Sequence, residues 1–159
     1  MKHIPILLGA LLITTSFTRC SKEDTPPQAQ GLHSYWMVNK DTVAYSNIIV
    51  NTAPLLSELR VNGPLSPETS LSFAFRMAGL PHSGTYKVDY VASDPSTMCN
   101  VYVTYRDTIY DVNPAHNTTT VGVSLLPSGK GRYVLEPTWF YKQLNPSDSI
   151  LVQGAITAP

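Results

Sequence analysis

The sequence predicts an all-β protein, a single antiparallel β-sandwich, with a β-barrel as the alternative. Many short runs alternate apolar and polar residues, which is the period of a strand with one buried face. Ser70–Met77 is the clearest of them, with Leu71, Phe73 and Phe75 predicted to point one way. Clusters of Gly, Pro, Asn and Ser separate these runs, and no run has the period of a helix. Several short strands divided by turn signals are typical of sandwiches and barrels.

Residues 1–19 read as a signal peptide. Lys2 and His3 form a basic start, and the apolar stretch from Ile4 to Ile13 is well short of the ~20 residues that a membrane-spanning helix needs. The stretch resembles a lipoprotein signal, in which a cysteine directly after the apolar region is acylated and becomes the new N-terminus. The resemblance implies lipidation of Cys20 and attachment to a membrane through that lipid. The alternative is a plain secretory signal.

Residues 20–31 are expected to be a lipidated cysteine followed by a flexible tether, because they carry Pro26 and Pro27 and almost no apolar side chain. About 11 extended residues reach ~35 Å. Residues 32–159 are expected to form the β domain. Loss of Lys2 and Arg19 with the signal leaves 11 − 2 = 9 basic residues against 11 acidic ones. The mature chain is thus slightly acidic, and it contains no run of basic residues. Both features argue against a nucleic-acid partner.

The β domain is expected to contain about nine strands. Gly154 is predicted to be a bulge or a point of close packing, and Pro137 is predicted to bend its strand or confine it to an edge. The sequence has two cysteines. With Cys20 acylated, Cys99 is expected to be a buried, unreactive thiol in a strand. The predicted strands are 35–39, 42–51, 55–61, 70–77, 85–91, 100–105, 118–126, 132–141 and 149–156, and residues 107–112 either continue 100–105 or begin a new short strand.

Nothing in the sequence indicates catalysis, a metal or a cofactor. His33, His82 and His116 have no partner at metal-ligand spacing, and there is no nucleophile elbow or phosphate-binding glycine loop. Four acids are predicted to lie on outward faces or in turns, where solvated charge is the ordinary explanation; they are Asp89, Asp107, Asp111 and Glu136. We therefore expect a protein that is not an enzyme. The enzymatic alternative is a carbohydrate-active accessory domain that uses these carboxylates.

Aromatic residues supply the candidate binding face. Most of them fall within predicted strands and are expected to pack in the core. Trp36, however, is out of phase with Tyr35 and Met37, and Trp139 and Tyr141 follow Pro137. Exposed Trp and Tyr side chains stack on sugar rings or anchor protein contacts. Trp36, Trp139 and Tyr141 are therefore the predicted binding residues.

The opening Cys20-Ser21-Lys22-Glu23-Asp24 and the order of strands resemble the small β-sandwich lipoproteins of the Bacteroidota. Acidic residues after the cysteine imply, in that group, the outer face of the outer membrane. Three tripeptides, which begin at Asp41, Asp107 and Asp148, resemble the O-glycosylation acceptor of that phylum. The resemblance implies that at least one hydroxyl is modified among Thr42, Thr108 and Ser149.

Together these observations predict a cell-envelope lipoprotein of the outer membrane, exposed at the surface, with a non-catalytic binding or structural role. The expected partners are the membrane, through the lipid, and an envelope protein or a glycan. The structural alternative is a subunit of a larger envelope assembly, in which exposed edge strands pair with other chains.

Overall fold

The computed structural model describes residues 33–89, 95–112, 118–143 and 145–159, which all lie within one compact unit, Gly31–Pro159. The prediction of an all-β fold is confirmed: these residues form an 11-stranded sheet and one short 3₁₀ turn, η1 (Pro95–Thr97). The strands are β1 (Tyr35–Val38), β2 (Asp41–Thr42), β3 (Asn47–Ala53), β4 (Leu56–Leu65), β5 (Glu68–Phe75), β6 (Gly84–Val88), β7 (Met98–Tyr105), β8 (Thr108–Val112), β9 (Thr120–Leu125), β10 (Gly131–Lys142) and β11 (Asn145–Thr157).

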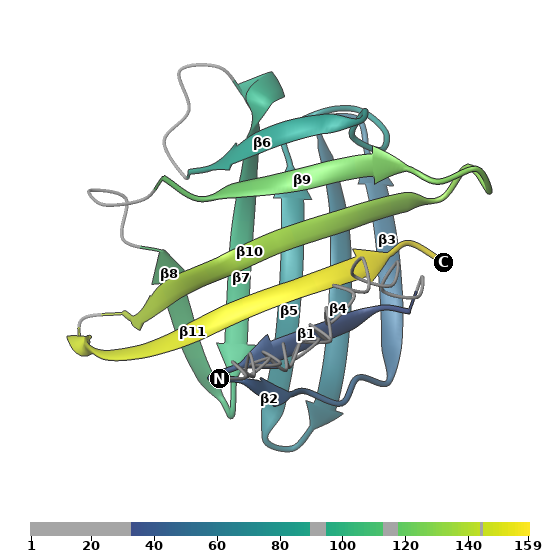
Figure 1. The fold of residues 1–159 in the computed structure, drawn as a ribbon. Coiled ribbons are helices and arrows are strands. Elements are labelled where there is room, and N and C mark those ends of the chain that lie inside the picture. The colour runs from purple at the N-terminus through teal and green to yellow at the C-terminus, as the bar shows by residue number, and fades with distance from the viewer. Residues whose placement is uncertain (1–32, 90–94, 113–117, 144) are drawn as a thin grey trace, which may run out of the picture. The chain divides into compact units, whose positions relative to one another are not determined.

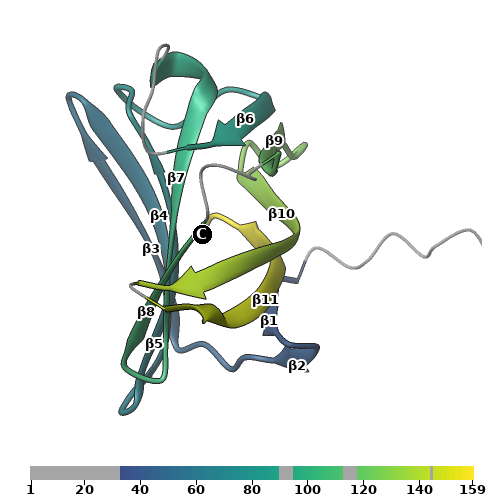
Figure 2. The same ribbon diagram turned by 90° about the vertical axis from the view of Figure 1, so that its left-hand side faces the viewer.

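The strands form two layers that belong to one sheet. One layer holds β3, β4, β5, β7 and β8, and the strands of the other, among them β9, β10 and β11, cross it at a steep angle (Figures 1 and 2). Pairing runs without interruption in the order β2-β1-β11-β10-β9-β6-β7-β5-β4-β3, and β8 pairs with both β7 and β10. The fold thus combines the layers of a sandwich with the partial closure of a barrel.

One pairing departs from the predicted antiparallel pattern. β6 and β7 run parallel over two residue pairs, Lys87↔Met98 and Val88↔Cys99. Parallel strands need a longer crossover connection than the tight turn of a hairpin. This short pairing joins the two layers along one side.

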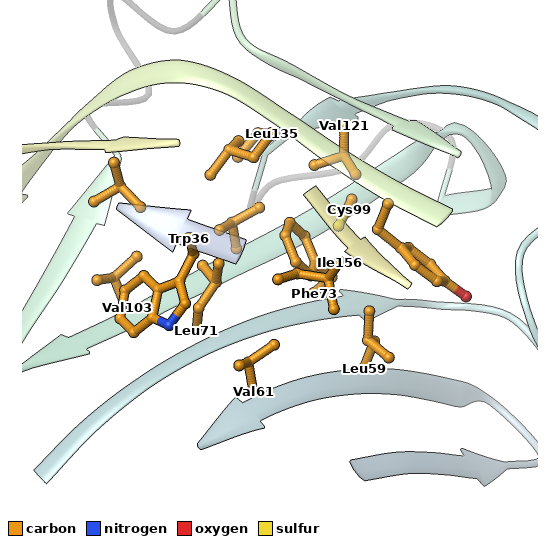
Figure 3. Close-up of a cluster of buried hydrophobic side chains, with 14 of the residues drawn as sticks. Trp36, Leu59, Val61, Leu71, Phe73, Cys99, Val103, Val121, Leu135 and Ile156 are labelled. Atoms are coloured by element: carbon orange, nitrogen blue, oxygen red, sulfur yellow. The ribbon is translucent and has the colours of Figure 1, made fainter. Parts of the chain in front are cut away.

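The core lies between the layers and is filled by the side chains that point inward, which are every second residue along most of the strands. Its aromatic centre contains Phe75 and Tyr86, whose ring centroids are 5.0 Å apart, together with Phe73 and Tyr133, 6.1 Å apart. Figure 3 shows this packing around Phe73, Ile156 and Cys99. Cys99 is free and fully buried, as predicted, and burial raises the pKa of its thiol well above the usual value.

Gly154 is a point of close packing, which is one of the two predicted alternatives. A Cβ atom at Gly154 would lie 2.9 Å from the Cβ of Trp36 and 2.9 Å from the carbonyl oxygen of Tyr35. Against β1 the register of β11 runs unbroken past Gly154. Against β10 the register shifts directly beside Gly154, between the pairs Leu135↔Gly154 and Thr138↔Val152, and the extra residue of this irregularity lies in β10. Pro137 therefore bends an interior strand and does not mark an edge.

The predicted strand 42–51 is wrong, because the chain changes layers within it. Asn39 and Lys40 both have positive φ (50° and 77°), as a two-residue hairpin turn requires, and they confine β2 to two residues beside β1. The next residues carry the chain to the other layer. There Ser46 donates its backbone N–H to the carbonyl of Asn62 at 2.7 Å, and β3 begins.

Two further expectations about strands are wrong. β5 was expected to be half-buried, but seven of its eight residues are buried, because its outward Ser72 is small and lies between Arg60 of β4 and Tyr102 of β7. Residues 145–148 were expected to form a turn, but β11 already begins at Asn145.

Candidate functional site

The structure separates the three predicted binding residues. Trp36 is fully buried and lies in the core with Leu71 and Val103 (Figure 3), so its assignment to a binding face is wrong. In β1 the inward residues are Trp36 and Val38, the opposite phase to the one predicted. The physical reason is Gly154, which lies opposite Trp36 in β11 and, having no side chain, leaves room for an inward indole.

Trp139 and Tyr141 do lie on the outer face, but within the sheet and not at an edge. Trp139 is 52% exposed, and Tyr141 is half-buried. Trp139 pairs with Leu151, whereas Tyr141 pairs with Ser149 on one side and with Asp111 on the other. The bend at Pro137 leaves both aromatic side chains pointing away from the core, while Phe140 between them points inward and is fully buried.

These two residues belong to a larger surface that we call the outer β10–β11 face. We define it by Trp139, Tyr141, Leu151, Gln153 and Met37. Strand register places Trp139 opposite Leu151, and Gln153 opposite Met37. Alternation along each strand places Tyr141 on the same face as Trp139, and Gln153 on the same face as Leu151. The Nε2 of Gln153 donates to the Sδ of Met37 at 3.3 Å. The result is a surface of one half-exposed indole with apolar and hydrogen-bonding neighbours.

One side of the outer β10–β11 face carries a carboxyl group. Asp111 of β8 lies opposite Tyr141, and partial burial raises the pKa of the Asp111 carboxyl above its ordinary value. Ser149 lies on the other side of Tyr141. A carboxylate, a hydroxyl and an amide thus border the aromatic residues, and such groups form hydrogen bonds with a polar ligand whose apolar face stacks on Trp139.

Of the carboxylates named from the sequence, Glu136 and Asp111 lie too far apart for a glycosidase pair, and Asp89 and Asp107 make other contacts. Glu136 lies five residues before Tyr141, the partner of Asp111, which is roughly 15 Å along a strand, and a glycosidase needs about 5–9.5 Å. Asp89 pairs with Lys87 at 3.3 Å, and Asp107 accepts a 2.6 Å hydrogen bond from the backbone N–H of Glu68. Among the described residues, no three or more His, Cys, Asp and Glu side chains gather closely enough to hold a metal ion.

The three predicted glycosylation hydroxyls lie apart. Thr42 is exposed in β2, whereas Thr108, at the start of β8, and Ser149 are half-buried. Ser149 was expected at the start of a strand, but β11 begins four residues earlier. Modification of these residues stays a prediction. Cys20 lies outside the described residues, and so does His116.

A pocket elsewhere on the β domain was not predicted from the sequence. It is a pocket of about 310 Å³ between the β1–β2 hairpin and the β7–β8 turn. Arg106 and Asp41 contribute opposite charges, and the Arg106 guanidinium lies 5.1 Å from the centroid of the Tyr105 ring, a cation–π distance. Its walls come from segments far apart in the sequence, so no local pattern could have revealed it. The lining residues are Asp41, Thr42, Val43, Ala44, Pro64, Pro67, Thr69, Tyr105 and Arg106.

Comparison with protein-family models, with curated proteins and with solved structures finds no match. No helix in the described part of the chain has the length and apolar character needed to cross a membrane.

Proposed function

We propose that the chain is an exported, lipid-anchored envelope protein whose β domain binds a glycan without catalysis, through the outer β10–β11 face. The observation that carries the proposal is the half-exposed indole of Trp139 (52%). It lies among Tyr141, Leu151 and Gln153, where flat apolar surface and hydrogen-bonding groups stand side by side.

The contribution of Trp139 to the binding free energy can be estimated from its exposed area. An aromatic side chain of this class buries 150–250 Å² when it is fully covered, so a ligand that covers the exposed half removes about 100 Å² from water. At about 25 cal/mol per Å² this is worth ~2.5 kcal/mol. Loss of the indole is therefore expected to weaken binding by about 10- to 100-fold, since 1.4 kcal/mol is a factor of ten.

Lipid anchoring is supported by the sequence around Cys20: a basic start, a short apolar stretch, and a polar tether of ~35 Å after the cysteine. In the native host, Cys20→Ala is expected to move the protein from the membrane fraction to the soluble fraction. The peptide that begins at Cys20 in the wild type is expected to carry acyl mass. Membrane recovery of Cys20→Ala would refute the anchor.

The binding test is a glycan array probed with the purified protein and two variants. Trp139→Ala is expected to lose at least ten-fold in affinity. Tyr102→Ala is the matched control, because Tyr102 is an aromatic residue of similar exposure (43%) on the outer face of the other layer. Bound glycans are expected to be recovered uncleaved. An array without hits, or equal loss in both variants, would contradict the proposal.

A second candidate function is that of a subunit in a larger envelope assembly. The observation that favours it is the edge of β3, which has no strand partner on one side among the described residues and can pair with another strand. Co-purification of a stoichiometric partner after crosslinking of intact cells would support the assembly role. Recovery of this protein alone would favour the binding role.

A further inference from the structure

The outer edge of β3 is left open. β3 pairs with β4 over all seven of its residues, from Asn47↔Asn62 to Ala53↔Leu56, without a bulge. On its other side it has no strand partner within the described part of the sheet, in which it is the last strand. Figures 1 and 2 show β3 at the outer side of its layer. Its backbone N–H and C=O groups on that side are therefore available for pairing.

This edge lacks the usual protection against other strands. Natural edge strands are kept from pairing by charged side chains, prolines, bulges or short length. Asn47–Ala53 contains no charged residue and no proline. The opposite edge of the sheet ends at β2, which is only two residues long and includes Asp41. The protein thus protects one edge and leaves the other open.

We propose that β3 pairs with β3 of a second copy of this chain, antiparallel, about a two-fold axis at Val50. Val50 is the middle residue of β3, so this register pairs the whole strand, with Asn47 opposite Ala53′ and Ile49 opposite Asn51′. In this register, core-facing residues of one copy lie opposite core-facing residues of the other, whereas a shift by one residue would set core-facing residues opposite outward-facing ones. Ile48 and Val50, which pack against the core, continue the core side of the sheet into the second copy.

The exposed apolar residue of β3 meets an uncharged neighbour in the same register. Ile49, 37% exposed, lies on the outer face opposite Asn51′ of the second copy. No charge within Asn47–Ala53 meets its own copy across the axis, so the contact is free of like-charge repulsion.

The test is disulfide crosslinking of the purified full-length chain. In a Cys20→Ser background, Val50→Cys adds one accessible thiol, because the remaining Cys99 is fully buried. The axis places the two Cys side chains directly opposite, within disulfide range. Thr52→Cys is the matched control, because the same register sets the two copies of residue 52 four positions apart. The proposal predicts a covalent dimer for Val50→Cys, with at least ten-fold less for Thr52→Cys.

A charge on the edge tests the same contact. Ile49→Lys, added to Val50→Cys, is expected to reduce the crosslinked fraction at least ten-fold, whereas Leu65→Lys, at a 90% exposed position in the β4–β5 hairpin, is expected to leave it unchanged. Far-ultraviolet circular dichroism checks that each variant is folded. Absence of crosslinking in Val50→Cys, or equal crosslinking in Thr52→Cys, would overturn the proposal. None of these readouts depends on glycan binding or on the lipid anchor.

Discussion

Gly154→Ala tests the packing between β1 and β11, the first and last strands of the β domain in sequence, which are neighbours in the sheet. The new methyl carbon would lie 2.9 Å from the Cβ of Trp36 and 2.9 Å from the carbonyl oxygen of Tyr35. Neither atom belongs to the flexible end of a side chain. Trp36 is fully buried, so β1 can retreat only by pulling its indole out of well-packed surroundings.

The expected loss of stability is about 2 kcal/mol. Forcing one extra methyl group into a packed core costs about 1–3 kcal/mol, and the rigid contacts at Gly154 place this case near the upper value. Replacing Gly by Ala in a strand returns about 0.5–1 kcal/mol through the lower entropy of the unfolded chain. For a domain of this size, 2 kcal/mol lowers Tm by roughly 8 °C.

The assay is thermal unfolding, with urea unfolding as the second measure and Gly122→Ala as the control. A Cβ atom at Gly122 meets nothing within 4 Å, and Gly122 also lies inside a strand, β9. Gly122→Ala is expected to leave Tm unchanged or to raise it slightly. A Tm of Gly154→Ala within 2 °C of the wild type would contradict the close contact at Gly154, because a domain of this size loses ~4 °C in Tm per kcal/mol.

Three other substitutions test the electrostatics and hydrogen bonding of the β domain. Burial raises the pKa of the Asp111 carboxyl. The contribution of this group to stability is therefore greatest below the ordinary pKa near 4 and falls as the pH rises through the raised pKa. In urea unfolding from pH 4 upward, Asp111→Asn should lack part of that fall, and a pH profile equal to that of the wild type would contradict the prediction. Burial first, and then the charges of Cys99 and Tyr86, raise the pKa of Tyr133 to about 12. Stability is therefore lost as the pH rises from about 10 towards 12, and Tyr133→Phe should lose less over that range. The Oγ of Ser57 is buried without a hydrogen-bond partner among the described residues, so Ser57→Ala should match or exceed the wild type in urea unfolding, and a loss above ~1 kcal/mol would reveal a partner such as a buried water.

The strands and the core could be predicted because alternation is a local property. Phe73 and Phe75, Val101 and Val103, and the thiol of Cys99 are all buried, as the period-two pattern indicated. The class of fold followed from the number of such runs and the turn signals between them. The arrangement of the sheet could not be predicted in the same way, because the parallel β6–β7 pairing and the double pairing of β8 join segments whose order in space leaves no local signal.

The candidate site shows the same limit. Trp139 and Tyr141 were identified because both follow Pro137 in one strand. Their neighbour Leu151 comes from the next strand, and Met37 lies about a hundred residues earlier, so neither could be assigned without the strand register. Trp36 was assigned to the wrong face because the phase of a four-residue strand is set by its partner, in this case by the space at Gly154.

The most direct test of the central proposal is the affinity of the purified protein for the best ligand from the glycan array, measured by calorimetry for the wild type, Trp139→Ala and Tyr102→Ala. Glycan binding through the outer β10–β11 face predicts a ten-fold or greater loss of affinity for Trp139→Ala, about 1.4 kcal/mol or more, with the affinity of Tyr102→Ala unchanged and the glycan intact after binding. Equal affinity of Trp139→Ala and the wild type would contradict the assignment of the outer β10–β11 face, and cleavage of the glycan would contradict a non-catalytic role.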